Sequence, residues 1–188
     1  MPTFTTLSLL ITFLLAFATS FPIDIETITK QGKGFSLTNV VLFGTALDGI
    51  GDFNGDGIGD IIASSEYSRS YTGAVYVIFG KKSRRPNIQP GRGLSPSQGF
   101  AILGSKPQDF LGSFVTGIGD INGDGLADIL VSANGVKNET GAAYVIYGTR
   151  KPLTTIFPVD GLDPSQGFAI LGSDLNGGLG RAACRAGD

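Results

Sequence analysis

The sequence predicts an all-β fold built from four-stranded β-propeller blades, with the propeller incomplete in this chain. Two observations lead to this prediction. The segment from Leu94 to Ser105 recurs as Leu162 to Ser173, with eleven of twelve residues identical at an offset of 68. Each copy also contains four short runs of β-branched, aromatic and aliphatic residues, with Gly, Asn or Pro near their ends. Four-stranded units at a regular period are typical of propeller blades.

The strands of the second copy are expected at 113–119, 126–133, 141–148 and 167–172. The same offset relates Gly73-Ala74 to Gly141-Ala142 and Tyr76 to Tyr144. The apolar runs are nearly continuous, which predicts strands buried on both faces. No stretch of the mature chain shows a helical period with caps.

The first 20 residues resemble a signal peptide. An uncharged apolar run ends at the small residues Ala18 and Ser20, so cleavage is expected before Phe21. The alternative is an uncleaved membrane anchor, although the run is short for a membrane span. No later segment is apolar for long enough to cross a bilayer, so the mature chain is expected to be secreted and soluble.

The composition limits the function. The net charge of −2 implies no general attraction to nucleic acid. The chain has no His, the commonest general base, and we expect it not to be an enzyme. Cys184 is the single cysteine, so it forms no internal disulfide and has either a partner outside the chain or a free thiol.

Six of the 16 acidic residues fall in two stretches with the pattern D-x-N-x-D-G-x-x-D, at 52–60 and 120–128. Oxygen side chains at positions 1, 3, 5 and 9 can converge if the chain curls, and position 7 offers a backbone carbonyl. The predicted metal ligands are Asp52, Asn54, Asp56, Ile58 and Asp60 in the first stretch, and Asp120, Asn122, Asp124, Leu126 and Asp128 in the second.

Hard oxygen ligands in this number favour Ca²⁺ at two sites, with Mg²⁺ less suited because it retains its waters. The stretches differ from an EF-hand, because position 12 is Ala63 or Val131 rather than Glu and the flanks are expected strands. Three converging carboxylates repel one another, so without a cation at least one should protonate or turn away. The alternative is a pair of Asx-rich turns that bind no metal.

We divide the chain into a signal peptide at 1–20, a lead-in at 21–34, repeats at 35–101 and 102–169, and the start of a third repeat at 170–188. Asp188 falls where a third acidic loop would begin. Closed propellers need about four to eight blades, so we expect a fragment of a longer protein. The alternative is self-association that completes the propeller.

These features resemble the FG-GAP repeats of the integrin α-subunit propeller and its relatives. The FG part is Phe43-Gly44 in the first repeat and Leu111-Gly112 in the second, and the GAP part is Gly73-Ala74-Val75 and Gly141-Ala142-Ala143. The resemblance implies a seven-bladed propeller in the intact protein, with calcium in loops that join the first two strands of a blade.

The resemblance further implies a module that binds an extracellular protein or glycan, in cell adhesion. The alternative is an accessory propeller of a secreted hydrolase such as a phospholipase.

Asn138 begins a glycosylation sequon, Asn138-Glu139-Thr140, with an ordinary polar turn as the alternative. The basic run at 81–85 is interpreted as a solvated loop rather than a polyanion patch or processing site.

Overall fold

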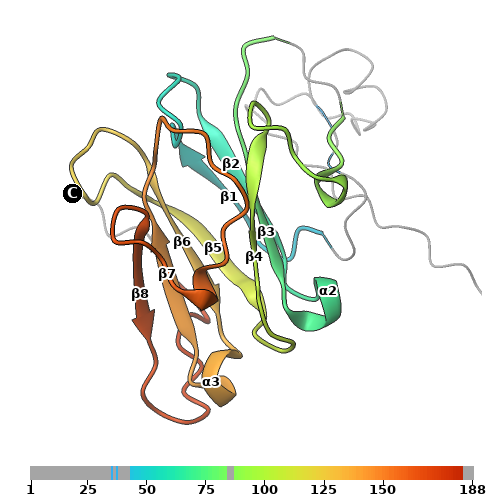
Figure 1. Ribbon diagram of the computed structural model, residues 1–188, viewed down its shortest axis with the longest axis vertical. Coiled ribbons are helices and arrows are strands. Elements are labelled where there is room, and N and C mark those ends of the chain that lie inside the picture. The colour runs from blue at the N-terminus through green and yellow to red at the C-terminus, as the bar shows by residue number, and fades with distance from the viewer. Residues whose placement is uncertain (1–34, 36, 38–42, 84–86, 184–188) are drawn as a thin grey trace, which may run out of the picture.

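The computed structural model describes Phe35, Leu37 and residues 43–83 and 87–183. These residues form two four-stranded antiparallel sheets (Figure 1). The first sheet contains, in spatial order, β1 (Leu47–Gly51), β2 (Asp60–Ser65), β3 (Ala74–Ile78) and β4 (Gly99–Leu103). The second contains β5 (Leu111–Gly119), β6 (Asp128–Ala133), β7 (Ala142–Ile146) and β8 (Gly167–Leu171). Both sheets are meanders of consecutive strands, as in propeller blades, which confirms the predicted fold class.

The two blades share one hydrogen-bonding register. Ala63 of β2 lies opposite Tyr76 of β3, and the residues 68 positions later, Val131 and Tyr144, are paired in the same way. β3 and β7 are buried along their whole length, as their continuous apolar sequences predict. The repeat boundary expected between residues 101 and 102 falls inside β4. Each expected repeat therefore ends two residues before the last strand of its blade ends.

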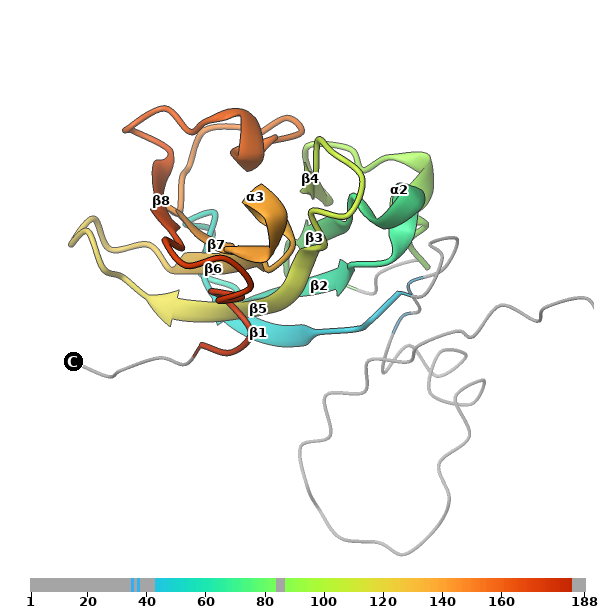
Figure 2. The ribbon, with the colours of Figure 1, turned by 90° about the horizontal axis from the view of Figure 1, so that it is seen from below.

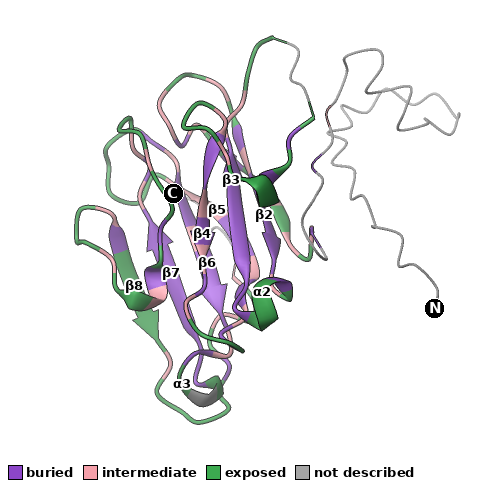
Figure 3. Ribbon diagram, turned by 45° about the vertical axis from the view of Figure 1, so that its right-hand side comes forward, coloured by how far each residue is buried: buried purple, intermediate pink, exposed green. Residues whose placement is uncertain are grey.

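The main core lies between the blades, where β5 packs against β1 and β2 (Figure 2). One face of the first blade is covered by the second, so Phe100 and Ile102 are only 3% and 0% exposed. The repeat-equivalent residues on the second blade, Phe168 and Ile170, are 41% and 45% exposed. Figure 3 shows this difference as an exposed β8 beside buried inner strands.

Short turns complete each blade. The connection from β2 to β3 contains α2 (Ser68–Tyr71), and the connection from β6 to β7 contains α3 (Val136–Glu139). Single turns of 3₁₀ helix, η1 (Pro90–Arg92) and η2 (Pro158–Asp160), lie ahead of β4 and β8. In the part of the chain that the structure describes, no helix is long and apolar enough to cross a membrane.

Several predicted features lie outside the described residues. These are the signal peptide at 1–20, the lead-in at 21–34, Cys184 and Asp188.

Candidate metal centres

The two acidic loops occupy the same position in each blade. One joins β1 to β2 and the other joins β5 to β6, at the end of the sheets opposite α2 and α3 (Figure 1). In each loop, the residue just before the loop pairs with the last residue of the loop, Gly51 with Asp60 and Gly119 with Asp128. Each pair follows an irregularity in the strand register. Gly51 and Gly119 have φ of 80° and 82°, a left-handed conformation that favours glycine.

The first loop is curled around its opening aspartate. Asp52 Oδ1 accepts hydrogen bonds from the backbone N–H groups of Gly55 and Asp56, at 2.8 and 3.0 Å, and Asp52 Oδ2 accepts one from Gly57 at 2.8 Å. Asn54 Oδ1 accepts from the N–H of Asp56 at 2.9 Å, and Asp56 Oδ1 accepts from the N–H of Ile58 at 2.9 Å. Side chains at positions 1, 3 and 5 therefore shape the turn.

The second loop repeats this network bond for bond. Asp120 accepts from Gly123, Asp124 and Gly125 at 2.8, 3.1 and 2.7 Å. Asn122 accepts from Asp124 at 3.0 Å, and Asp124 from Leu126 at 2.9 Å. These amides, led by that of Gly125, hold the pKa of the Asp120 carboxyl below its ordinary value. The loop thus stabilises a carboxylate at its first position.

The last aspartate of each loop is buried beneath it. Asp60 accepts hydrogen bonds from the N–H groups of Phe53 and Gly80 at 2.9 and 2.7 Å, and Asp128 accepts from Ile121 and Gly148 at 2.9 and 2.8 Å. Burial raises the pKa of Asp60 to about 6, although these amides oppose the shift. Burial also raises the pKa of Asp128. A buried carboxylate of this kind is stabilised by a nearby cation.

The candidate ligands are thus brought into one small loop, but their carboxylates do not converge on a point. Within the described ranges, no three or more His, Cys, Asp or Glu side chains form a group that could hold a metal ion. The carboxylates still influence one another, since Asp56 raises the pKa of Asp60, and Asp124 and Asp120 raise that of Asp128. The all-oxygen donor set and the tight curl nevertheless fit Ca²⁺ chemically, because Ca²⁺ accepts flexible coordination that includes amide and backbone carbonyl oxygens.

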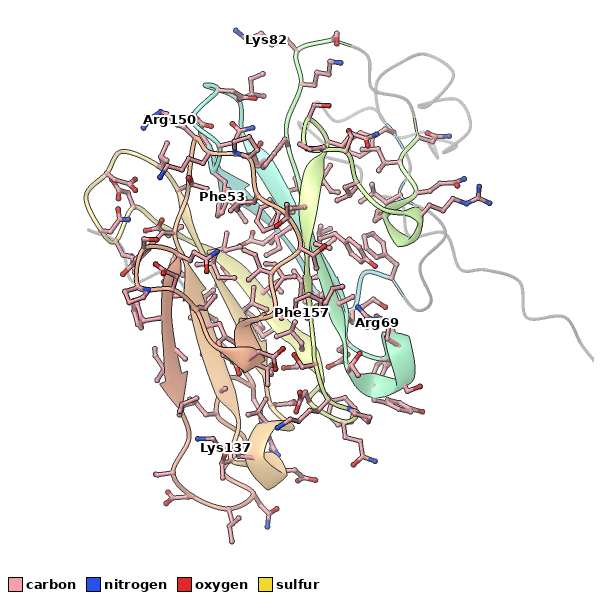
Figure 4. All side chains as sticks on the ribbon, in the orientation of Figure 1. Phe53, Arg69, Lys82, Lys137, Arg150 and Phe157 are labelled. Carbon is pink, nitrogen blue, oxygen red and sulfur yellow. The ribbon has the colours of Figure 1, made fainter. Side chains whose placement is uncertain are left out.

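The structure adds one feature to the first loop that sequence reasoning missed. The second blade holds this loop from outside, because Thr149 N–H donates to the carbonyl of Phe53 at 2.9 Å and the Phe53 ring is fully buried between the blades. Arg150 lies beside the loop (Figure 4), with its Nε 2.8 Å from the position that a Cβ on Gly55 would take. No signal in the sequence pairs these distant residues.

Comparison with known proteins agrees with this architecture. The sequence pattern of the FG-GAP repeat family matches residues 43–78 and 112–146, which contain both acidic loops. Integrin alpha pat-2 of Caenorhabditis briggsae is 31% identical over 155 residues, which are 76% of this chain and 11% of that protein. Integrin alpha-X of Homo sapiens is 33% identical over 96 residues, 50% of this chain and 8% of that protein.

A relative of another class is phosphatidylinositol-glycan-specific phospholipase D of Bos taurus. It is 32% identical over 140 residues, 67% of this chain and 16% of that protein. The chain therefore spans less than a fifth of the length of each of these three relatives. Two matched repeats, each with the same blade and the same loop, show that the chain belongs to the FG-GAP repeat family.

Proposed function

We propose that the chain is a secreted, non-catalytic module that binds Ca²⁺ at both acidic loops and binds an extracellular protein or glycan in cell adhesion. The observation that supports calcium binding most directly is the hydrogen-bond network around Asp52, repeated at every position around Asp120. Hydrogen bonds from backbone amides curl each nine-residue loop, which carries oxygen-bearing side chains at four of its positions.

The proposed ligands of the first ion are the side chains of Asp52, Asn54, Asp56 and Asp60 with the carbonyl of Ile58, and those of the second are Asp120, Asn122, Asp124 and Asp128 with the carbonyl of Leu126. When bound, Ca²⁺ supplies positive charge that offsets repulsion among the three carboxylates of a loop. Binding to the folded state alone raises stability by mass action.

Thermal unfolding and calorimetry test the calcium proposal. Addition of Ca²⁺ to chelator-treated protein should raise the melting temperature, and titration should show two sites. Asp56→Ala and Asp124→Ala should each remove one site. A melting temperature and a heat signal that do not respond to Ca²⁺ would reject calcium binding, and a response to Mg²⁺ of equal size would reject the preference for Ca²⁺.

The adhesion role rests on similarity to integrin α subunits. Similarity to a phospholipase D supports the second candidate, an accessory propeller of a secreted hydrolase. The full-length transcript separates the two, since further repeats followed by a membrane helix support adhesion and a catalytic domain supports the hydrolase.

Sequencing the amino terminus of the secreted protein tests cleavage before Phe21. A mass shift on deglycosylation that is lost in Asn138→Gln tests the sequon.

A further inference from the structure

The two acidic loops are in direct contact across the boundary between the blades. Ala127, at position 8 of the second loop, donates its N–H to the carbonyl of Asp52, at position 1 of the first loop, over 3.0 Å. The adjacent Leu126 places its Cδ2 3.0 Å from the position that a Cβ on Gly55 would take. One dipeptide of the second loop therefore contacts the first loop through both its backbone and its side chain.

Leu126 differs from its repeat equivalent, Ile58, in what its side chain reaches. Each side chain packs on a glycine of its own blade, Ile58 through Cγ2 against Gly80 and Leu126 through Cβ against Gly148. Leu126 extends further, to Gly55 of the neighbouring loop, and is only 4% exposed. Its carbonyl belongs to the proposed ligand set of the second loop, so the same residue serves one loop with its backbone and the other with its side chain.

We propose that the two loops bind Ca²⁺ as a positively coupled pair, and that Leu126 and Ala127 carry the coupling. This inference rests on the proposed calcium binding. A cation in the second loop fixes the backbone at Leu126, which fixes the side chain and the Ala127 N–H against the first loop. The first loop then loses less conformational freedom when it binds its own ion. By linkage, an ion in the first loop strengthens binding at the second by the same factor.

The second loop receives no matching support among the described residues. A Cβ on Gly123, the equivalent of Gly55, would meet nothing within 4 Å, and Ile121, the equivalent of Phe53, is 48% exposed. Among the described residues, the first loop is thus held by a neighbouring blade and the second loop is not. For a chain of these residues we therefore expect the first loop to bind Ca²⁺ more tightly, because more of its ordering is already complete.

Nuclear magnetic resonance can follow the two loops separately in the full chain. Gly57 and Gly125 each occupy position 6 of a loop and donate to its first aspartate, so their amide shifts report local Ca²⁺ binding. In Asp124→Ala, which disables the second loop, the Kd at Gly57 should rise by at least about fivefold. In Asp56→Ala, the Kd at Gly125 should rise by the same factor. Equal Kd values in wild type and both variants would overturn the coupling.

Leu126→Ala tests the proposed route, because it keeps the backbone carbonyl and removes the contact with Gly55. The Kd at Gly57 should rise several-fold, and Leu126→Met, which restores length, should return it towards wild type. Leu171→Ala, at an exposed leucine of β8 outside both loops, is the control and should leave the Kd at Gly57 unchanged. Strand amide dispersion confirms that each variant is folded.

An unchanged Kd at Gly57 in folded Leu126→Ala would overturn the route. Shifts at both loops without coupling would reject this inference alone. Wild-type protein whose loops show no Ca²⁺-dependent shift would reject the calcium proposal and the coupling together.

Discussion

Phe53 and Ile121 occupy the same position in the two acidic loops, yet Phe53 is 0% exposed and Ile121 is 48% exposed. Phe53 enters the core between the blades, where its ring lies 5.4 Å from that of Phe100, centroid to centroid. No described residue covers the Ile121 side chain to the same extent. The first loop is therefore part of the interface between the blades.

Substitution at these two positions should have very different effects on stability. Phe53→Ala removes a fully buried ring and should cost about 3–5 kcal/mol of unfolding free energy, whereas Ile121→Ala should change it by less than about 1 kcal/mol. Urea unfolding of both variants, without Ca²⁺, measures this difference. Similar losses in the two variants would show that the loop does not join the blades as described.

Replacing a loop glycine by alanine should affect the first acidic loop, which the second blade contacts, more than the second acidic loop. Gly55 and Gly123 have φ of 76° and 77°, so an alanine at either site should cost about 1 kcal/mol in backbone strain. At Gly55 the new Cβ would also meet Arg150 and Leu126 at 2.8–3.0 Å, whereas at Gly123 it would meet nothing within 4 Å. Gly55→Ala should therefore be the more destabilising variant by thermal unfolding, and the reverse order would contradict the contact.

Arg150 should weaken calcium binding at the first loop, because its positive charge lies beside that loop. We expect Arg150→Gln to lower the Kd of the first site by about twofold to fivefold at low ionic strength, and by less at high salt. Lys82 is the repeat-equivalent residue and projects away from the sheets in Figure 4, so Lys82→Gln is the control. Calorimetric titration at two salt concentrations measures both, and equal effects would refute a local role for Arg150.

Asp109, in the connection between the blades, should produce a pH-dependent change in stability. Burial raises its pKa above the ordinary value of 3.8, opposed by Lys106 and aided by the carboxylate of Asp160. The folded state therefore binds the proton more tightly than the unfolded state. Its contribution is full below pH 3.8 and is lost as the pH rises through the raised pKa.

The stability of Asp109→Asn relative to wild type should therefore increase as the pH rises from about 3 to about 7. Asp163 provides a control of opposite sign, because hydrogen bonds from Ser165 lower its pKa. Its contribution is present above the ordinary pKa and is lost as the pH falls, so Asp163→Asn should lose relative stability as the pH rises. Urea unfolding across this range measures both differences, and parallel pH profiles for the two variants would contradict the assignments.

Much of the fold was predictable because its determinants are local or repeated. The strand near Tyr144 was expected at 141–148 and forms at Ala142–Ile146, since a continuous apolar run between glycines suits a strand buried on both faces. The curl of each acidic loop is also local, because Asp52 bonds to amides only three to five residues away. Residue types within nine positions were enough to predict it.

The sequence by itself determined the repeat, the blades and the oxygen-rich loops, because each depends on neighbours in the chain or on one fixed offset. Only the tertiary structure decided that the loops differ. Gly55 meets Leu126 and Arg150 across more than 70 residues of chain, and no pattern in either segment encodes that approach. Identical loop patterns acquire different surroundings because burial depends on which blade lies beside them.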